Sequence, residues 1–332
     1  MWIATGATNQ ARALASATLL PDGRVLVAGG TPDSGGAPLA SAEIYDPATG
    51  TWALTGSMNE ARTPGSAVLL PDGRVLIVGG ASGSGLLASA ELYDPGSGTW
   101  TSTSAMPAAG SGPAVLLTTG KVLVLGGATS AELYDPTAGT WTATGSLNAR
   151  RAASTATLLL DGRVLVTGGL GPTLASAEIY DPAAGTWTPT ADMTRPRQYH
   201  SATLLSDGRV LVFGSGSDTL GPVASAEVYD PATATWTPVA PLREGRNSCT
   251  ATLLPGGEVL VAGGMGLDPV VTSAELFDPR LGTWSPTASL IDARMHHAAM
   301  LLRDGRVLVV GGFAADGQAL SSAELFRPAG SP

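Results

Sequence analysis

A Gly-Gly doublet that follows a short apolar run recurs along the chain and constrains the fold more than any other feature. Consecutive copies are 42 to 50 residues apart, so the 332 residues hold seven copies of one unit. The copies, of which the fifth is degraded to Gly-Ser, begin at Gly29, Gly79, Gly126, Gly168, Gly214, Gly263 and Gly311. A period of this length predicts a ring or array of repeats, in which each unit packs against its neighbours.

Each unit is expected to contain four short β-strands. In the first unit they are residues 16–20, 24–30, 41–47 and 51–56. Asp22-Gly23 joins the first two strands and suits a tight hairpin, and an Asp-Pro turn joins the last two. The 44 glycines and 24 prolines argue against stacked helices. The sequence therefore predicts an all-β, seven-bladed propeller that spans residues 1–332 as one domain.

The doublets, the spaced tryptophans and a Tyr-Asp pair in five units resemble the kelch-repeat family across essentially the whole chain. The Tyr-Asp pairs are Tyr45-Asp46, Tyr93-Asp94, Tyr134-Asp135, Tyr180-Asp181 and Tyr229-Asp230. The last unit, about residues 298–327, has no tryptophan, and Trp2 stands at the other end of the chain. We therefore expect residues 1–8 to complete the last blade and close the ring, which leaves no free sheet edge.

Two charged columns run through the repeats. Every unit has a glutamate, in the order Glu43, Glu91, Glu132, Glu178, Glu227, Glu275 and Glu324. Six units have an arginine, and Gly110 replaces it in the third: Arg12, Arg62, Arg151, Arg197, Arg246 and Arg294. We interpret the columns as structural ion pairs within or between blades. The net charge of −9 excludes a basic nucleic-acid surface as the leading hypothesis.

One face of the predicted propeller varies from blade to blade. The Asp-Gly hairpins and the Asp-Pro turns fall on one face and are short and uniform. The opposite face, here called the variable face, carries the loops between the second and third strands and the connections between blades. Its loops include residues 31–40, 215–224 and 313–320, against only Ala128-Thr129 in the third unit. Length variation confined to one face predicts that ligands bind there.

The three residues that follow the arginine column lead into the innermost strand, and we call them the axial segment of each blade. These segments are small in the first four units. In the last three they are Gln198-Tyr199-His200, Asn247-Ser248-Cys249 and Met295-His296-His297, which hold every histidine and the only cysteine. Nearby loops add Met265, Asp218, Asp268, Phe313 and Asp316. This clustering predicts a binding funnel at the axis. The alternative is that the histidines only satisfy hydrogen bonds inside the repeat.

The segment from Arg197 to Asp218 is similar to one in the galactose oxidase and glyoxal oxidase family of copper enzymes. The resemblance implies that Tyr199 and His200 match copper ligands of that family. The pattern departs elsewhere, because Cys249 follows this motif whereas the cysteine of the family's crosslink precedes it. A site with copper or zinc would use His200, His296 and His297.

The leading functional hypothesis is a propeller that binds a small molecule or a protein partner through the variable face and the axial funnel. No complete catalytic motif, such as a nucleophile elbow or a phosphate loop, is present. The alternative is an enzyme of the cyclase, isomerase, lyase or metal-dependent oxidase type. In it His200, His297 and Tyr199 would be catalytic, as general acids and bases or as hydrogen-bond donors. A scaffold is a third hypothesis.

The same sequence limits the expected partners and environment. No apolar run approaches the ~18 residues of a membrane helix, so we expect a soluble protein with no membrane partner. We also expect a monomer that does not bind nucleic acid. The chain is either cytoplasmic or exported after removal of a signal peptide.

Overall fold

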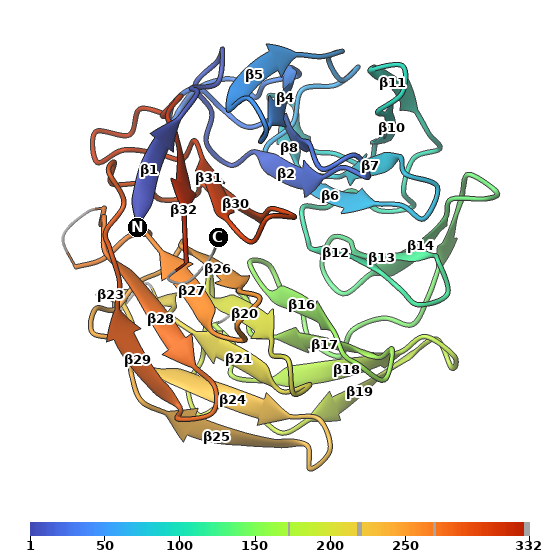
Figure 1. Cartoon of the computed structure of the whole chain (residues 1–332). Helices are drawn as coiled ribbons and strands as arrows, with labels where there is room; N and C mark the ends of the chain where they lie inside the picture. Colours follow the sequence, from blue (N-terminus) through green and yellow to red (C-terminus); the bar gives the residue numbers. More distant parts are fainter. Residues whose placement is uncertain (172, 218–220, 268–269, 329–332) are drawn as a thin grey trace.

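The described residues of the computed structural model, 1–171, 173–217, 221–267 and 270–328, form an all-β ring (Figure 1). They include seven four-stranded antiparallel sheets, which are the blades of a seven-bladed propeller. Each of the first six blades runs outward from the axis in chain order, from its first strand to its fourth. The fold class predicted from the repeats is confirmed.

The first four blades carry the N-terminal half of the chain. Blade 1 consists of β2 (Ser16–Leu19), β3 (Val25–Ala28), β4 (Ala42–Asp46) and β5 (Thr51–Leu54). Blade 2 consists of β6 (Ser66–Leu69), β7 (Val75–Val78), β10 (Ala90–Asp94) and β11 (Thr99–Ser102). Blade 3 consists of β12 (Ala114–Leu116), β13 (Val122–Leu125), β14 (Ala131–Asp135) and β15 (Thr140–Ala143). Blade 4 consists of β16 (Thr155–Leu158), β17 (Val164–Thr167), β18 (Ala177–Asp181) and β19 (Thr186–Thr190).

The remaining three blades complete the ring. Blade 5 consists of β20 (Ser201–Leu204), β21 (Val210–Phe213), β24 (Ala226–Asp230) and β25 (Thr235–Val239). Blade 6 consists of β26 (Thr250–Leu253), β27 (Val259–Ala262), β28 (Ala274–Asp278) and β29 (Thr283–Pro286). Blade 7 consists of β30 (Ala298–Leu301), β31 (Val307–Val310), β32 (Ala323–Phe326) and β1 (Trp2–Thr5). Two short ribbons decorate variable-face loops: β8 (Ala81–Ser82) with β9 (Gly85–Leu86), and β22 (Gly216–Ser217) with β23 (Gly221–Pro222).

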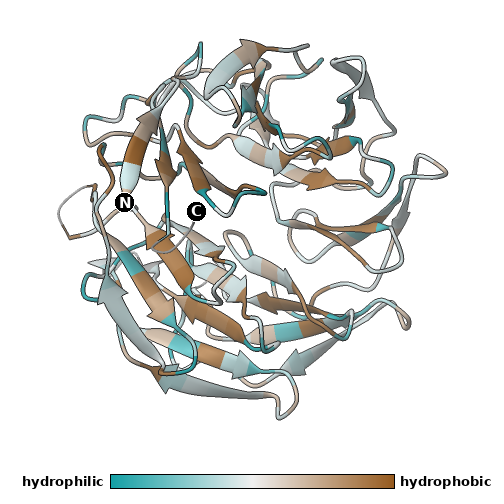
Figure 2. Ribbon diagram, viewed as in Figure 1, coloured by the Kyte–Doolittle hydropathy of each residue, from teal (hydrophilic) through white to brown (hydrophobic). Residues whose placement is uncertain are grey.

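The hydrophobic core is divided among the interfaces between neighbouring blades. Between blades 7 and 1, for example, Val25 and Val27 pack in one cluster with Leu308 and Val310. Both faces of each second strand are buried because a blade lies on either side, so these strands consist mostly of Val, Leu and Ile. Figure 2 shows apolar residues concentrated in the inner and middle strands and a paler, more polar outer layer.

The N-terminal strand closes the ring as predicted. Trp2 in β1 pairs with Phe326 in β32, and their rings lie 5.1 Å apart. The same cross-strand aromatic pair recurs as Tyr45 with Trp52 at 5.0 Å in blade 1. In Figure 1 the first strand, β1, therefore lies beside the last strand, β32, in one blade. The indole N–H of Trp2 donates to Ala288 O at 2.8 Å, which also links the closing strand to the connection from blade 6.

We expect the Trp2→Ala substitution to lower the free energy of unfolding by about 3–5 kcal/mol, the usual cost of removing a large buried aromatic side chain. Trp2 is only 7% exposed, whereas its neighbour Ile3 is 37% exposed on the opposite side of β1. The matched control Ile3→Ala should cost less than about 1 kcal/mol. Urea unfolding of both variants measures the difference. Equal losses would contradict a closing role for Trp2.

Candidate functional site

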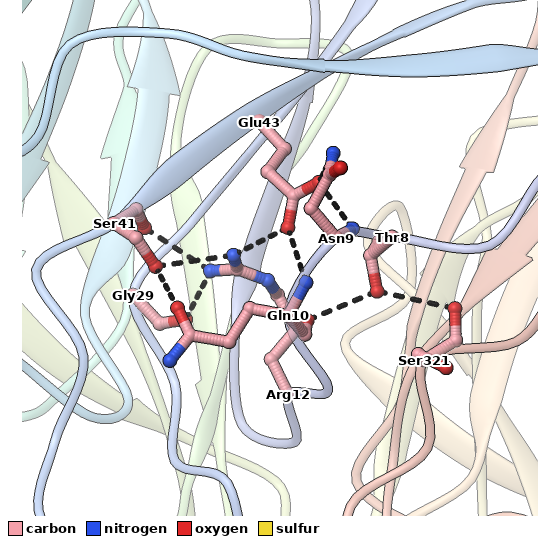
Figure 3. Close-up of polar contacts among 8 residues, drawn as sticks. All are labelled: Thr8, Asn9, Gln10, Arg12, Gly29, Ser41, Glu43 and Ser321. Atoms are coloured by element: carbon pink, nitrogen blue, oxygen red, sulfur yellow. Dashed lines mark hydrogen bonds and ion pairs between the residues drawn. The ribbon is translucent and has the colours of Figure 1, made fainter.

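A buried arginine ties each axial segment to its blade. In blade 1 the Arg12 guanidinium donates to Gly29 O at 2.9 Å, to Ser41 O at 3.1 Å and to Glu43 Oε1 at 2.8 Å (Figure 3). The other oxygen of Glu43 accepts hydrogen bonds from the backbone and the side chain of Asn9. We call this set of a guanidinium, a glycine carbonyl, a serine and a glutamate the brace of a blade.

The brace recurs in blades 2, 4, 5, 6 and 7, which confirms the Glu–Arg pairing and places it within each blade. The arginine–glutamate distances lie between 2.7 and 3.1 Å, and these arginine side chains are at most 1% exposed. Each guanidinium also donates to the carbonyl of the first glycine of its doublet, or to Gly214 in the degraded copy. Because the brace is buried, its breakage leaves an unpaired charge in the interior.

The backbone of the axial segments forms an incomplete collar around the axis. The Tyr199 N–H donates to Ala153 O at 3.2 Å, the Ser248 N–H to Tyr199 O at 3.3 Å and the His296 N–H to Ser248 O at 3.0 Å. The Leu14 N–H then donates to His296 O at 2.9 Å, so the bonds run from blade 4 through blade 7 to blade 1.

The middle residue of each segment in this collar has a left-handed backbone. The φ angles are 50 to 56° for Leu14, Ala153, Tyr199, Ser248 and His296. Blade 2 has Pro64 at this position, which has no N–H to donate and cannot adopt a positive φ. The collar therefore stops at blade 2, and we call the variable-face end of the axis, inside this collar, the axial mouth.

His200 and His297 lie beneath the axial mouth, each in a different interface between blades. His200 Nε2 is 2.8 Å from Thr167 Oγ1 of blade 4, and His297 Nε2 is 2.8 Å from Thr250 Oγ1 of blade 6. Both histidines are 7% exposed. Burial, and secondarily the nearby brace arginines, lower the pKa of each imidazole to about 3. The two rings are therefore neutral at physiological pH and are engaged with threonine hydroxyls.

Tyr199 and His296 are placed differently, since they belong to the collar itself. Tyr199 is 49% exposed. His296 is half-buried and meets the ring of Phe313 edge-on, with the ring centres 6.2 Å apart, and burial lowers its pKa. Met265 is 37% exposed and bridges to Asn247, one residue before the collar residue Ser248. Tyr199, His296 and Met265 therefore give blades 5 to 7 two aromatic rings and one thioether beside the mouth, whereas Phe313 is buried.

The remaining predicted residues surround this surface or lie away from it. Gln198 is buried, and its Oε1 atom has no hydrogen-bond partner among the described residues. Asn247 Oδ1 accepts a bond from Ser248 Oγ, Cys249 packs in the core between blades 5 and 6, and Met295 bridges to Phe313. Asp316 lies on an exposed loop and accepts a bond from the Gln318 N–H. Asp218 and Asp268 lie outside the described residues.

The donor set does not fit the proposed copper or zinc site. His200 and His297 are held in separate interfaces by Thr167 and Thr250, while His296 stands in the collar. Across the described part of the chain, no group of three or more His, Cys, Asp or Glu side chains could hold a metal ion. The grouping of the three histidines into one metal site therefore has no support from the geometry.

Several features of the site were not predicted from the sequence. Two threonine partners of the histidines could have been found, because Thr155 and Thr250 begin their inner strands where blades 1, 2 and 5 have serine. Thr155 Oγ1 lies 3.1 Å from His200 Nε2, and Thr250 Oγ1 lies 2.8 Å from His297 Nε2. The sequence gives no indication of the left-handed collar, because none of the collar residues is glycine. Hollows of 250 to 600 Å³ also lie on the uniform face, between neighbouring Asp-Gly hairpins. Their charged groups pair locally, as Asp161 does with Arg163, so these hollows offer few free binding groups.

Comparison with known proteins agrees with the repeat architecture. The family model described as the kelch motif matches residues 15–59, 62–107, 151–194 and 199–243. No curated protein matches the chain. A fungal alcohol oxidase of the AA5 family, solved in complex with copper, has a similar fold with a TM-score of 0.79. The match covers 99% of this chain and 76% of the oxidase at 20% identity, which shows the fold alone. Within the described residues no helix is long and apolar enough to cross a membrane.

We expect the resonances of His200 and His297 to show neutral imidazoles down to about pH 4, because burial holds their pKa near 3. The unfolded chain binds these protons below about pH 6.5, so the free energy of unfolding should fall as the pH drops from 6.5 to 4.5. Each histidine contributes up to about 1.4 kcal/mol per pH unit to that slope. NMR titration checks the charge, and urea unfolding of His200→Gln should show a flatter slope. An imidazole of His200 that titrates near pH 6.5 would disprove the buried placement.

Proposed function

Because the chain belongs to the kelch-repeat family, we propose that it is a binding module whose ligand sits over the axial mouth of the variable face. The kelch propeller fold supports a binding or scaffold role. The proposed ligand is a small molecule or a segment of a protein partner. It contacts the surface formed by Tyr199, Met265 and His296, where the His296 ring packs against the buried Phe313.

The backbone strain at Tyr199 and His296 carries this proposal. A non-glycine residue in the left-handed region costs roughly 1–2 kcal/mol, and bulky residues are rarely found there. This chain has glycine at most of its left-handed positions, yet it has tyrosine at φ 50° and histidine at φ 52° beside the axis. Such strain clusters at functional sites, where the side chain has a use that offsets its cost.

Unpaired polar atoms in the axial segments indicate the chemistry of the ligand. Thr63 Oγ1, Ser154 Oγ and Gln198 Oε1 are buried without hydrogen-bond partners among the described residues. Buried polar atoms in native proteins are nearly always paired with protein groups, water or a ligand. We therefore infer a ligand that combines an aromatic or apolar group with polar hydrogen-bonding groups.

The enzyme alternative receives less support from the same geometry. Acid–base catalysis needs a group whose pKa lies near the working pH, and burial holds His200 and His297 far below it. The fungal protein of similar fold is a copper-bound alcohol oxidase, but here His200, which the resemblance matches to a copper ligand, and His297 are bonded to threonines in separate interfaces. Catalytic roles for His200, His297 and Tyr199 stay predictions.

A paired glycine substitution tests the proposal. Tyr199→Gly removes a half-exposed side chain and relieves backbone strain, so we expect little change in Tm but loss of ligand binding. Ala234→Gly is the matched control, because Ala234 is also left-handed, at φ 53°, but lies in an exposed turn of the uniform face. It should raise the free energy of unfolding by up to about 1 kcal/mol and leave binding unchanged.

The measurement is a ligand-observed NMR screen of aromatic small molecules and peptides against the wild type and both variants. Ligands of the axial mouth should be lost in Tyr199→Gly and retained in Ala234→Gly. Ligands that bind Tyr199→Gly as well as the wild type would contradict the axial site. A large drop in Tm for Tyr199→Gly would show that the tyrosine is structural.

A further inference from the structure

Blade 3 retains a buried carboxylate but lacks the groups that donate to its equivalents in other blades. Gly110 takes the place of the brace arginine, and Pro107 takes the place of Asn59 of the preceding connection. In blade 2, Asn59 donates two hydrogen bonds to the brace glutamate, Glu91, from its backbone N–H and its side-chain amide. Proline has neither donor. Glu132 is buried, only 2% exposed, and its Oε2 atom therefore has no hydrogen-bond partner among the described residues.

Every acceptor of the brace is nevertheless present in blade 3. In blade 1 the guanidinium is held by the Gly29 carbonyl, both oxygens of Ser41 and the carboxylate of Glu43 (Figure 3). The corresponding residues of blade 3 are Gly126, Ser130 and Glu132. The Gly126 N–H donates to Ser130 O at 3.0 Å, just as the Gly29 N–H donates to Ser41 O at 3.1 Å. The acceptor groups for a guanidinium are therefore all present, although the Ser130 hydroxyl here donates to Gly127 O at 3.0 Å.

The backbone of the loop over Glu132 differs from the corresponding loops of the other six blades, in which an arginine fills the brace. The first doublet glycine is left-handed in the other blades, as at Gly29 with φ 71°, whereas in blade 3 Ala128 is left-handed, with φ 58°, in place of Gly126 and Gly127. A Cβ atom on Gly126 would lie 2.6 Å from Glu132 Oε2, so this backbone rests against the carboxylate. Both glycines are present without using the left-handed conformation, which leaves the loop able to adopt the geometry of the other blades.

We propose that blade 3 contains a recessed receptor for one guanidinium group supplied by another molecule. The Glu132 carboxylate would accept two of its N–H donors, and Gly126 O and Ser130 would accept others. Binding moves the 126–130 loop off the carboxylate and returns the doublet to its left-handed form. The chemical class of the ligand is an alkylguanidinium, such as the end of an arginine side chain, because its planar fork matches the carboxylate.

The electrostatics of blade 3 favour a cation at this point. Among the described residues no arginine or lysine pairs with Glu132, and burial raises the pKa of its carboxyl. A guanidinium would restore the favourable ion pair that the other six blades have. The site lies in the brace of blade 3, apart from the surface of blades 5 to 7, so it is independent of the function proposed above.

The test uses methylguanidinium chloride on the intact protein near pH 8, with sodium chloride and tetramethylammonium chloride at the same concentrations as controls. We expect only methylguanidinium to raise the Tm of the wild type, by about 2 °C when the site is saturated. Glu132→Gln keeps the shape of the side chain but removes its charge, so its Tm should not respond. Arg151→Gly keeps the Glu132 site and vacates a second brace in blade 4, so its Tm should rise by more than that of the wild type.

Hydrogen exchange gives a second readout that does not depend on a variant. Amides of residues 126–130 should change their exchange rates on addition of methylguanidinium, while amides of the blade 4 doublet should not. A wild-type Tm that responds equally to all three salts overturns the proposal. So does a response of Glu132→Gln equal to that of the wild type, or an unchanged exchange rate in residues 126–130.

Discussion

The buried arginine brace is the interaction on which the rest of the propeller depends. In six blades one guanidinium joins the connection from the previous blade to the second strand, through a glycine carbonyl, and to the third strand, through a serine and a glutamate. Hydrophobic packing between blades holds neighbours together but is not directional. The brace adds directional hydrogen bonds, because the N–H donors of a planar guanidinium point in fixed directions toward the glycine carbonyl, the serine and the glutamate. Each inner strand therefore starts at a fixed place beside the axis.

This rigid anchor allows the axial segments to depart from ordinary backbone geometry. Tyr199 and His296 follow within two residues of a brace arginine, and their left-handed conformations persist because the anchor and the collar bonds overdetermine them. In the proposed function, stability and recognition are assigned to adjacent residues of the same segment. Arg197 belongs to the brace, whereas Tyr199 faces solvent at the axial mouth. The residue two positions after each brace arginine can therefore vary without changing the fold, as Leu14, Tyr199 and His296 do.

The sequence predicted the structural features that depend on residues recurring in most of the repeats. The blades, the closure by Trp2 and the Glu–Arg pairs each follow from a column of residues, and the structure confirms them. Features that depend on one neighbour were harder to predict. The grouping of His200 with His297 followed from their shared column, but side chains at that position turn into the interface with the preceding blade. Each histidine therefore meets a threonine of that blade and lies in its own interface. The left-handed collar could not be predicted either, because Leu14, Tyr199 and His296 are residues that normally avoid it.

The energetic role of the brace can be measured by urea unfolding of Arg197→Ala and of the double variant Arg197→Ala with Glu227→Gln. We predict that the free energy of unfolding of the single variant falls by about 3–5 kcal/mol, because the substitution leaves the buried Glu227 carboxylate without its ion-pair partner. The double variant should recover part of that loss, since the orphaned charge is gone. A loss below about 1 kcal/mol in the single variant, the value of an exposed ion pair, would contradict the central role of the brace.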